Sequence, residues 1–231
     1  MSTPKVDDLI LQSDIIEIEK QVINFQNNGN SLFLTSSFQT HSIPLLHLIH
    51  SIDQKIPIYF LDTGYHFTET ISFKNELKTK FGFNIIDVSS PIERINQRDS
   101  DGRLMYASDP DYCCYMNKVL PLEPLLQKHD IWVSGVRKSQ SSFRAGLEKI
   151  IKGKFDTLRY HPILDWTSKM IYDYRLEFNL PAHPLEEKGY FSVGCMPCTR
   201  KQDVNSDPRE ARWFGMNKTE CGLQTETVES K

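Results

Sequence analysis

The sequence lacks an excess of basic residues, since 27 Lys and Arg face 30 Asp and Glu for a formal net charge of −3. This balance does not favour a nucleic-acid partner, so any anion site must be local. No apolar run approaches the roughly 18 residues that a membrane span requires. The amino-terminal stretch carries acidic side chains without a contiguous apolar core, which is not typical of a signal peptide. These absences predict a cytoplasmic protein with no nucleic-acid or membrane partner.

Cysteine is scarce, and its count of five is odd. An odd count disfavours a framework of disulfides in a reducing compartment. Four of the cysteines form two close pairs, Cys113-Cys114 and Cys195-x-x-Cys198, whereas Cys221 stands alone near the end of the sequence. This partition predicts a four-thiolate metal site together with one chemically distinct thiol.

Short apolar runs alternate with segments of helical periodicity along most of the chain. Strands are predicted at 31–36, 57–61, 83–88, 131–135 and 157–160, and helices at 6–26, 41–53 and 67–81. Strands separated by helices predict an α/β fold with a mostly parallel sheet and helices on both faces. We expect one domain over residues 1–205 and a mobile arm over 206–231, because little periodicity remains after His183.

The two cysteine pairs allow three interpretations. Consecutive side chains diverge, so Cys113 and Cys114 do not easily reach one tetrahedral zinc. An iron–sulfur cubane is larger, and neighbouring thiolates can bind different irons; four cysteines are its usual ligands. The cluster is therefore favoured, while a structural zinc or a set of buried, metal-free thiols stays open.

The lone Cys221 lies among charged residues and glycine, in the segment Lys218-Thr219-Glu220-Cys221-Gly222. A structural cysteine normally lies in an apolar run. A nearby cation such as Lys218 would lower the pKa of the thiol and increase its thiolate fraction. Cys221 is thus a candidate nucleophile, and the alternative is an incidental surface cysteine.

A hydroxyl-rich turn at residues 35–42 follows the first predicted strand and precedes a helix. Ser36, Ser37 and Thr40 are candidates to bind phosphate or sulfate, because a helix amino terminus offers free N–H groups and the positive end of its dipole. The alternative is ordinary helix capping. The turn has no Walker A lysine, which argues against P-loop ATPase chemistry.

A second polar loop at residues 135–144 follows the predicted strand 131–135. Ligands of α/β sheets bind at the carboxyl ends of strands, which is where this loop lies. Any isolated cation could equally be a solvated surface charge, but several gather here and near Cys221. The candidate anion-binding residues are Arg137, Lys138, Gln140 and Arg144 in the loop and Arg209 and Arg212 before Cys221.

Seven segments in this order resemble the phosphoadenylyl-sulfate/adenylyl-sulfate reductase family over residues 31–224. They are the turn 35–42, Leu61-Asp62-Thr63-Gly64, Cys113-Cys114 with Lys118-Val119 and Pro121-Leu122, the loop 135–144, His161-Pro162-Ile163-Leu164-Asp165-Trp166, Gly194-Cys195-Met196-Pro197-Cys198-Thr199, and Lys218–Leu223.

The resemblance implies an adenine-nucleotide α-hydrolase-like fold whose PP-type loop is the turn 35–42. It implies a [4Fe–4S] cluster on Cys113, Cys114, Cys195 and Cys198. It implies reduction of adenylyl sulfate to sulfite and AMP through an S-sulfocysteine on Cys221, with thioredoxin or a similar dithiol protein as electron donor. Lys118 would lie near the cluster or the substrate sulfate.

Two positions depart from the family's pattern: Gln224 replaces the usual histidine after Cys-Gly-Leu, and Asn117 replaces the arginine after the cysteine pair. Three alternatives stay open: a reductase of 3′-phosphoadenylyl sulfate or of both substrates, a PP-loop ATP pyrophosphatase, and a non-enzymatic nucleotide-binding regulator. The sequence also leaves the oligomeric state open, a homo-oligomer included.

Overall fold

A six-stranded sheet forms the centre of the part of the chain that the computed structural model describes, which is residues 6–202, 211–216, 218 and 220–225. Its strand order is β3-β2-β1-β4-β6-β5, and the neighbouring pairs are parallel except for β5 with β6. The strands are β1 (Leu32–Thr35), β2 (Ile58–Asp62), β3 (Ile85–Ser89), β4 (Ile131–Val133), β5 (Ile150–Lys152) and β6 (Leu158–Tyr160).

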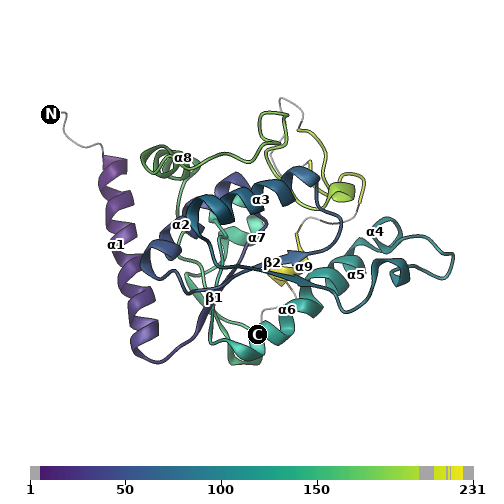
Figure 1. The fold of residues 1–231 in the computed structure, drawn as a ribbon, viewed down its shortest axis with the longest axis horizontal. Helices are drawn as coiled ribbons and strands as arrows, with labels where there is room; N and C mark the ends of the chain where they lie inside the picture. Colours follow the sequence, from purple (N-terminus) through teal and green to yellow (C-terminus); the bar gives the residue numbers. More distant parts are fainter. Residues whose placement is uncertain (1–5, 203–210, 217, 219, 226–231) are drawn as a thin grey trace.

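Helices cover the sheet on both sides (Figure 1). The longer ones are α1 (Val6–Asn27), α2 (Ile43–Ile52), α3 (Thr68–Phe81), α6 (Leu120–Lys128) and α8 (Ser168–Glu177). The shorter ones are α4 (Met105–Ser108), α5 (Pro110–Cys114), α7 (Ser142–Ala145) and α9 (Gly222–Thr225). No helix among the residues described here is long and apolar enough to cross a membrane.

The two faces of the sheet have separate apolar cores because side chains alternate along each strand. Leu34 of β1, Phe60 of β2 and Val133 of β4 face one way and pack with helices α1, α2, α3 and α8. Phe33 and Trp132 face the other way and pack against α6. Strands buried on both faces read as continuous apolar runs, which is why the sequence revealed them.

The order of the strands reverses at β1, which lies between β2 and β4. From β1 the chain moves outward to β2 and β3, and it later returns to the other side of β1 as β4. The connections after β1 and β4 therefore leave the sheet in opposite directions and open a crevice at its carboxyl edge. This crevice receives the turn after Thr35 and the loop that begins at Ser134.

One continuous helical run at residues 110–128 carries the first cysteine pair. Pro110 at its first turn and the Asp109 carboxylate, which accepts a hydrogen bond from the Tyr112 N–H at 2.9 Å, define its start. Between α5 and α6 the run is π-helical at η3 (Tyr115–Val119). Such stretches are frequent at functional sites, and this one contains Lys118.

The predicted α/β architecture is confirmed, with each predicted strand and helix found close to its expected range. Strand β5 was not anticipated, because its alternate side chains are exposed and it pairs antiparallel with β6 at the edge of the sheet. Residues 184–202 show little periodicity in the sequence, yet they pack onto the rest of the domain, and Leu185 and Val193 are buried. The division at residue 205 stays a prediction.

Gly82→Ala should destabilise the fold. Gly82 ends α3 with φ of 71°, a left-handed conformation that costs an alanine about 1 kcal/mol, even though the space around its missing Cβ is open. Gly146→Ala is the matched control, because Gly146 ends α7 at φ of −86°. Urea unfolding should show a lower midpoint for Gly82→Ala alone; equal midpoints would contradict the argument.

Candidate active site

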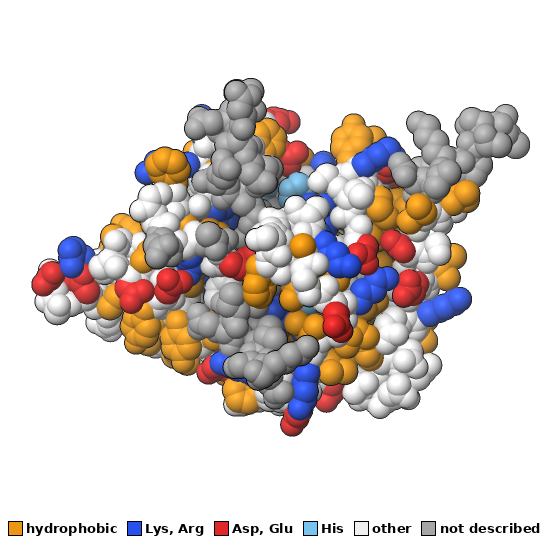
Figure 2. All heavy atoms as spheres, turned by 180° about the vertical axis from the view of Figure 1, so that it is seen from behind, with side chains coloured by type: hydrophobic (Ala, Val, Ile, Leu, Met, Phe, Trp, Pro, Cys, Tyr) orange, Lys and Arg blue, Asp and Glu red, His pale blue; other side chains and the backbone are white. Residues whose placement is uncertain are grey.

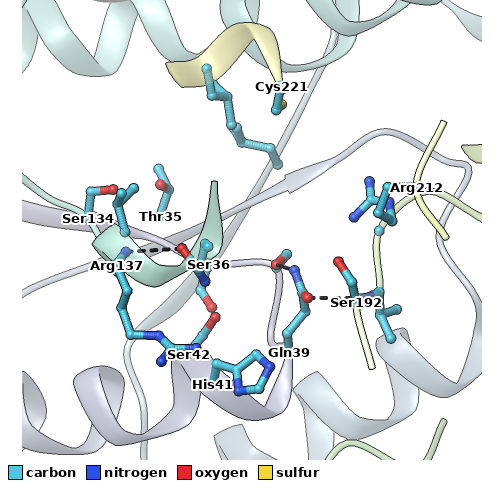
Figure 3. A pocket seen from close by; sticks show the side chains of 18 of the residues that line it. Thr35, Ser36, Gln39, His41, Ser42, Ser134, Arg137, Ser192, Arg212 and Cys221 are labelled. Carbon is cyan, nitrogen blue, oxygen red and sulfur yellow. Dashed lines mark hydrogen bonds between the residues drawn. The ribbon is translucent and has the colours of Figure 1, made fainter. Parts of the chain in front are cut away.

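A cavity of about 510 Å³ lies in the crevice at the carboxyl ends of β1 and β4. This volume suits a nucleotide-sized ligand. Its walls come from segments far apart in the sequence, and Figure 3 shows Arg137 and Arg212 on opposite sides of the view with Cys221 facing the helix-start residues His41 and Ser42. On the face of the molecule in Figure 2, the acidic and basic side chains of the described residues are interspersed.

The turn after β1 forms one wall through Ser36 and Ser37. The Ser36 hydroxyl accepts a hydrogen bond from the Phe38 N–H at 2.9 Å, and Phe38 is buried with φ of 54°. The positive φ of Phe38 and this hydrogen bond together turn the chain sharply after β1, so the residues just before α2 face the cavity. Thr40 does not line the cavity, because its hydroxyl accepts the His183 N–H at 2.9 Å.

Arg137 supplies a buried positive charge from the loop after β4. Its side chain is 3% exposed and donates to the Trp166 carbonyl at 3.3 Å and the Ser168 hydroxyl at 3.4 Å. Within the described residues its Nε has no hydrogen-bond partner, and no carboxylate pairs with it. Burial, followed by the nearby Arg144, lowers the pKa of Arg137, so an anionic ligand would be stabilised there.

Lys138 and Arg144, from the same loop, behave differently from Arg137. The Lys138 ammonium pairs with Asp165 at 2.8 Å at the surface and does not line the cavity. Arg144 does line it, but its guanidinium is paired with Glu220 at 2.7 Å. Gln140 lines the cavity and accepts the Arg137 N–H at 3.0 Å. The sequence alone could not distinguish these partners.

Arg212 reaches the cavity over Gly194. A Cβ added to Gly194 would lie 2.2 Å from a terminal nitrogen of Arg212, so only glycine leaves room for the guanidinium. The Arg212 Nε donates to the Cys198 carbonyl at 3.2 Å, and the guanidinium stacks 4.7 Å from the Trp213 ring centre. Its placement therefore depends on the segment that contains the second cysteine pair. Arg209 lies outside the described residues.

Lys118 and Cys221 lie close together at the side of the cavity where the described tail segment, residues 220–225, packs. The Lys118 ammonium lies 3.8 Å from the Cys221 sulfur and 3.9 Å from that of Cys114. A hydrogen bond from the Cys114 thiol and the charge of Lys118, acting against burial, hold the pKa of Cys221 well below its usual range. Lys118 thus lies within hydrogen-bonding distance of the Cys221 sulfur, and Lys218, which also interacts electrostatically with that sulfur, hydrogen-bonds to Asp111.

Burial opposes a charge on Lys118, yet the thiols of Cys114, Cys195 and Cys221 together raise its pKa well above the usual value. Among the described residues no carboxylate pairs with this ammonium. A buried cation without a carboxylate partner stabilises thiolates and incoming anions strongly, since little water screens it.

The four paired cysteines line a second, small cavity beside the first, together with Asn117 and Lys118. All four are buried. Burial and the neighbouring Cys195 and Cys198 raise the pKa of Cys113 to about 11, because both oppose a negative charge on its sulfur. In the described part of the chain, no three metal-binding side chains are gathered closely enough for a single metal ion.

The cysteines of the adjacent pair point to different neighbours. Asn117 lies one helical turn after Cys113 and donates to its sulfur at 3.6 Å, whereas Lys118 lies one turn after Cys114 and donates to that sulfur at 3.9 Å. The Cys195 sulfur lies 3.3 Å from the Thr63 hydroxyl. Thiols that surround a common cavity from different directions fit a multi-iron cluster better than one tetrahedral ion.

The structure brings most of the predicted site residues together. Ser36, Ser37, Lys118, Arg137, Gln140, Arg144, Arg212 and Cys221 line the large cavity, and Thr40 and Lys138 do not. Sequence reasoning missed Gln39, His41, His66, Ser134, Ser192 and Trp213, which also line it. Gln39, His41 and Ser134 belong to the same strand-end segments, so their position after an apolar run was the signal that could have identified them.

Comparison with known proteins assigns the family. The model of the phosphoadenosine phosphosulfate reductase domain matches residues 31–201. The chain belongs to the phosphoadenosine phosphosulfate reductase domain family. It is 38% identical over 197 residues to a protein of Bacillus subtilis (strain 168) named adenosine 5′-phosphosulfate reductase 1, and the match covers 84% of each chain.

The solved structures of other proteins agree with the fold of this reductase-domain family. A Candida auris phosphoadenylyl-sulfate reductase has a TM-score of 0.64 at 18% identity, covering 84% of this chain and 97% of the other. A Candida glabrata FMN adenylyltransferase has a TM-score of 0.61 at 18% identity, covering 100% of this chain and 78% of the other. The predicted adenine-nucleotide α-hydrolase-like, PP-loop type of fold is confirmed.

Lys118→Met should raise the pKa of the Cys221 thiol, because it removes the buried cation that stabilises the thiolate. The pH dependence of Cys221 alkylation by iodoacetamide, at matched iron content, reports this pKa. In the unaltered protein the lowered pKa of Cys221 keeps its thiolate present as the pH falls. The variant has a higher pKa and therefore less thiolate at neutral pH, so it should be alkylated more slowly there. Lys149→Met removes an exposed ammonium that pairs with Glu17 and is the control. An unchanged profile for Lys118→Met would rule the lysine out.

Proposed function

We propose that this chain is an assimilatory adenylyl-sulfate reductase that reduces adenylyl sulfate to sulfite and AMP in the cytoplasm. The family assignment and the name of the Bacillus subtilis relative support the substrate class. The observation that carries the proposal is the Cys221 sulfur, which lies 3.8 Å from a buried lysine at the edge of a nucleotide-sized cavity.

Substrate binding follows from the distribution of charge in the cavity. Ser36 and Ser37, beside the start of α2, would hold the phosphate of adenylyl sulfate with hydroxyl and backbone donors. Lys118, Arg137 and Arg212 line the cavity without a carboxylate partner in the described part of the chain, so they would face the sulfonate group. Their charge reduces the repulsion between an anionic substrate and an anionic nucleophile.

Cys221 would carry out the first chemical step. Its thiolate attacks the sulfur of adenylyl sulfate, the bond from that sulfur to the bridging oxygen breaks, and AMP departs with the electron pair. The product on the enzyme is an S-sulfocysteine. The Lys118 ammonium, 3.8 Å from the Cys221 sulfur, supports this role, because a nearby cation stabilises the reactive thiolate.

A dithiol protein such as thioredoxin would complete the reaction. One of its thiolates attacks the Cys221 sulfur and releases sulfite, and its second thiol resolves the mixed disulfide, so the dithiol supplies both electrons. Cys221 is half-buried in the docked tail. We propose that the arm at 206–231 moves so that one sulfur can meet the nucleotide and then the reductant.

Cys113, Cys114, Cys195 and Cys198 would hold a [4Fe–4S] cluster, since they surround one small buried cavity from several directions. Bound there, the cluster would supply a fixed negative charge beside the substrate cavity. Lys118 would balance that charge, and Asn117 would donate to the Cys113 thiolate. The cluster would thereby join the helical run 110–128 to the segment that positions Arg212.

Cys221→Ser should lower sulfite release by roughly a thousandfold or more, because the hydroxyl is a far weaker nucleophile and leaving group. Adenylyl-sulfate affinity and iron content should stay close to those of the unaltered protein, which separates chemistry from folding. In the assay, adenylyl sulfate and 3′-phosphoadenylyl sulfate compete with each other as substrates, and thioredoxin is the electron donor. Turnover that survives in Cys221→Ser would end the proposed mechanism, and a preference for the 3′-phosphorylated substrate would change the substrate assignment.

Cys198→Ser should remove most of the iron and sulfide and the visible absorbance of protein purified without oxygen, since each cluster iron needs its thiolate. Cys221→Ser is the matched control and should keep both. The readout is iron and sulfide content per chain, together with zinc content. Stoichiometric zinc in the unaltered protein would contradict the cluster.

A further inference from the structure

Arg144 was predicted to bind an anion, and it does line the cavity. Unlike the other predicted cations that line the cavity, it is paired with a carboxylate among the described residues. Its Nε donates to one oxygen of Glu220 at 3.0 Å and a terminal nitrogen donates to the other at 2.7 Å. The two side chains are only 9% and 7% exposed. A two-pronged, buried pair of this kind is geometrically specific, and removal of either partner leaves an uncompensated charge.

The Glu220 carboxylate also accepts a side-chain hydrogen bond from the loop after β4 and a backbone hydrogen bond from its own segment. The Ser141 hydroxyl donates to it at 3.1 Å, and the backbone N–H of Cys221 donates to it at 3.1 Å. Glu220 directly precedes Cys221, so the position of the carboxylate determines where the reactive sulfur can lie. The pair therefore connects the loop after β4 with the residue that contains the nucleophile.

Charge balance gives the pair a second role. A carboxylate adjacent in sequence to a thiolate would repel both that thiolate and an anionic ligand. Arg144 neutralises Glu220 at close range, so the positive charge of Lys118, Arg137 and Arg212 is left for the ligand. The guanidinium of Arg144 is committed to the tail of its own chain.

We propose that Arg144 and Glu220 form a positioning pair that holds the Cys221 sulfur in the cavity beside Lys118. Arg144 then serves the nucleophile and does not bind the sulfonate, in contrast to the expectation from the sequence. This inference rests on the proposed role of Cys221 as nucleophile.

The pair can be tested with Glu220→Gln, Arg144→Gln and the double variant in the full-length protein. The first measurement is the single-turnover rate at which adenylyl sulfate sulfonates Cys221, followed by mass spectrometry. The second is hydrogen–deuterium exchange of the peptide that contains residues 220–225. The third is the affinity for adenylyl sulfate in a Cys221→Ser background, where no reaction occurs.

Each single variant should slow sulfonation by about tenfold and increase exchange in the tail peptide, while the affinity changes less than about twofold. Arg144→Gln should be the slower of the two, because it leaves the Glu220 carboxylate next to the nucleophile without the guanidinium that neutralises it at close range. The double variant should regain much of the lost rate, since two amides restore neutrality and can hydrogen-bond. Glu17→Gln, which alters an exposed pair with Lys149, is the matched control and should match the unaltered protein.

A loss of adenylyl-sulfate affinity of about tenfold in Arg144→Gln, with Glu220→Gln unaffected in every measurement, would overturn the proposal and assign Arg144 to the substrate. Unchanged rates and exchange in both single variants would also overturn it. If Arg144→Gln does not fold, Glu220→Gln gives the same test. Absence of any sulfonation in the unaltered protein would refute the proposed function, whereas the exchange measurement would still test the pair.

Discussion

The site depends on a positive charge, that of Lys118, buried among thiols. Burial of an ammonium is costly, and it is offset here by the sulfurs of Cys114, Cys195 and Cys221, which raise its pKa. The same charge lowers the pKa of Cys221, so each group stabilises the ionised form of the other. The π-helical stretch η3 places Lys118 one turn after Cys114 and at the edge of the nucleotide-sized cavity.

The cavity follows from the topology of the sheet. Because β1 has β2 on one side and β4 on the other, the segments that follow β1 and β4 diverge, and the space between them is lined by serines and by Arg137. The residues near the second cysteine pair close this space from the other side through Arg212. The proposed cluster would thus lie next to the substrate cavity, with Lys118 shared between the two.

Pairing decides what each cation of the site contributes. Arg137, Lys118 and Arg212 have no carboxylate partner in the described part of the chain, and they supply the field that an anionic ligand needs. Lys138 is neutralised by Asp165 at the surface, and Arg144 is neutralised by Glu220 inside the cavity wall. The loop at residues 135–144 therefore offers a ligand less positive charge than its three cations suggest. One of these cations, Arg144, binds Glu220 of the tail segment instead.

The sequence by itself determined the α/β architecture and singled out Cys221 and the two cysteine pairs as candidates, because these depend on local patterns: apolar runs, helical periodicity and spacing. It could not determine that Thr40 bonds to the segment at His183, that Lys138 turns to Asp165, or that Arg144 pairs with Glu220. Those outcomes depend on partners far away along the chain. Folding decides which partner comes within hydrogen-bonding distance, and a buried charge takes the partner that the packing offers it.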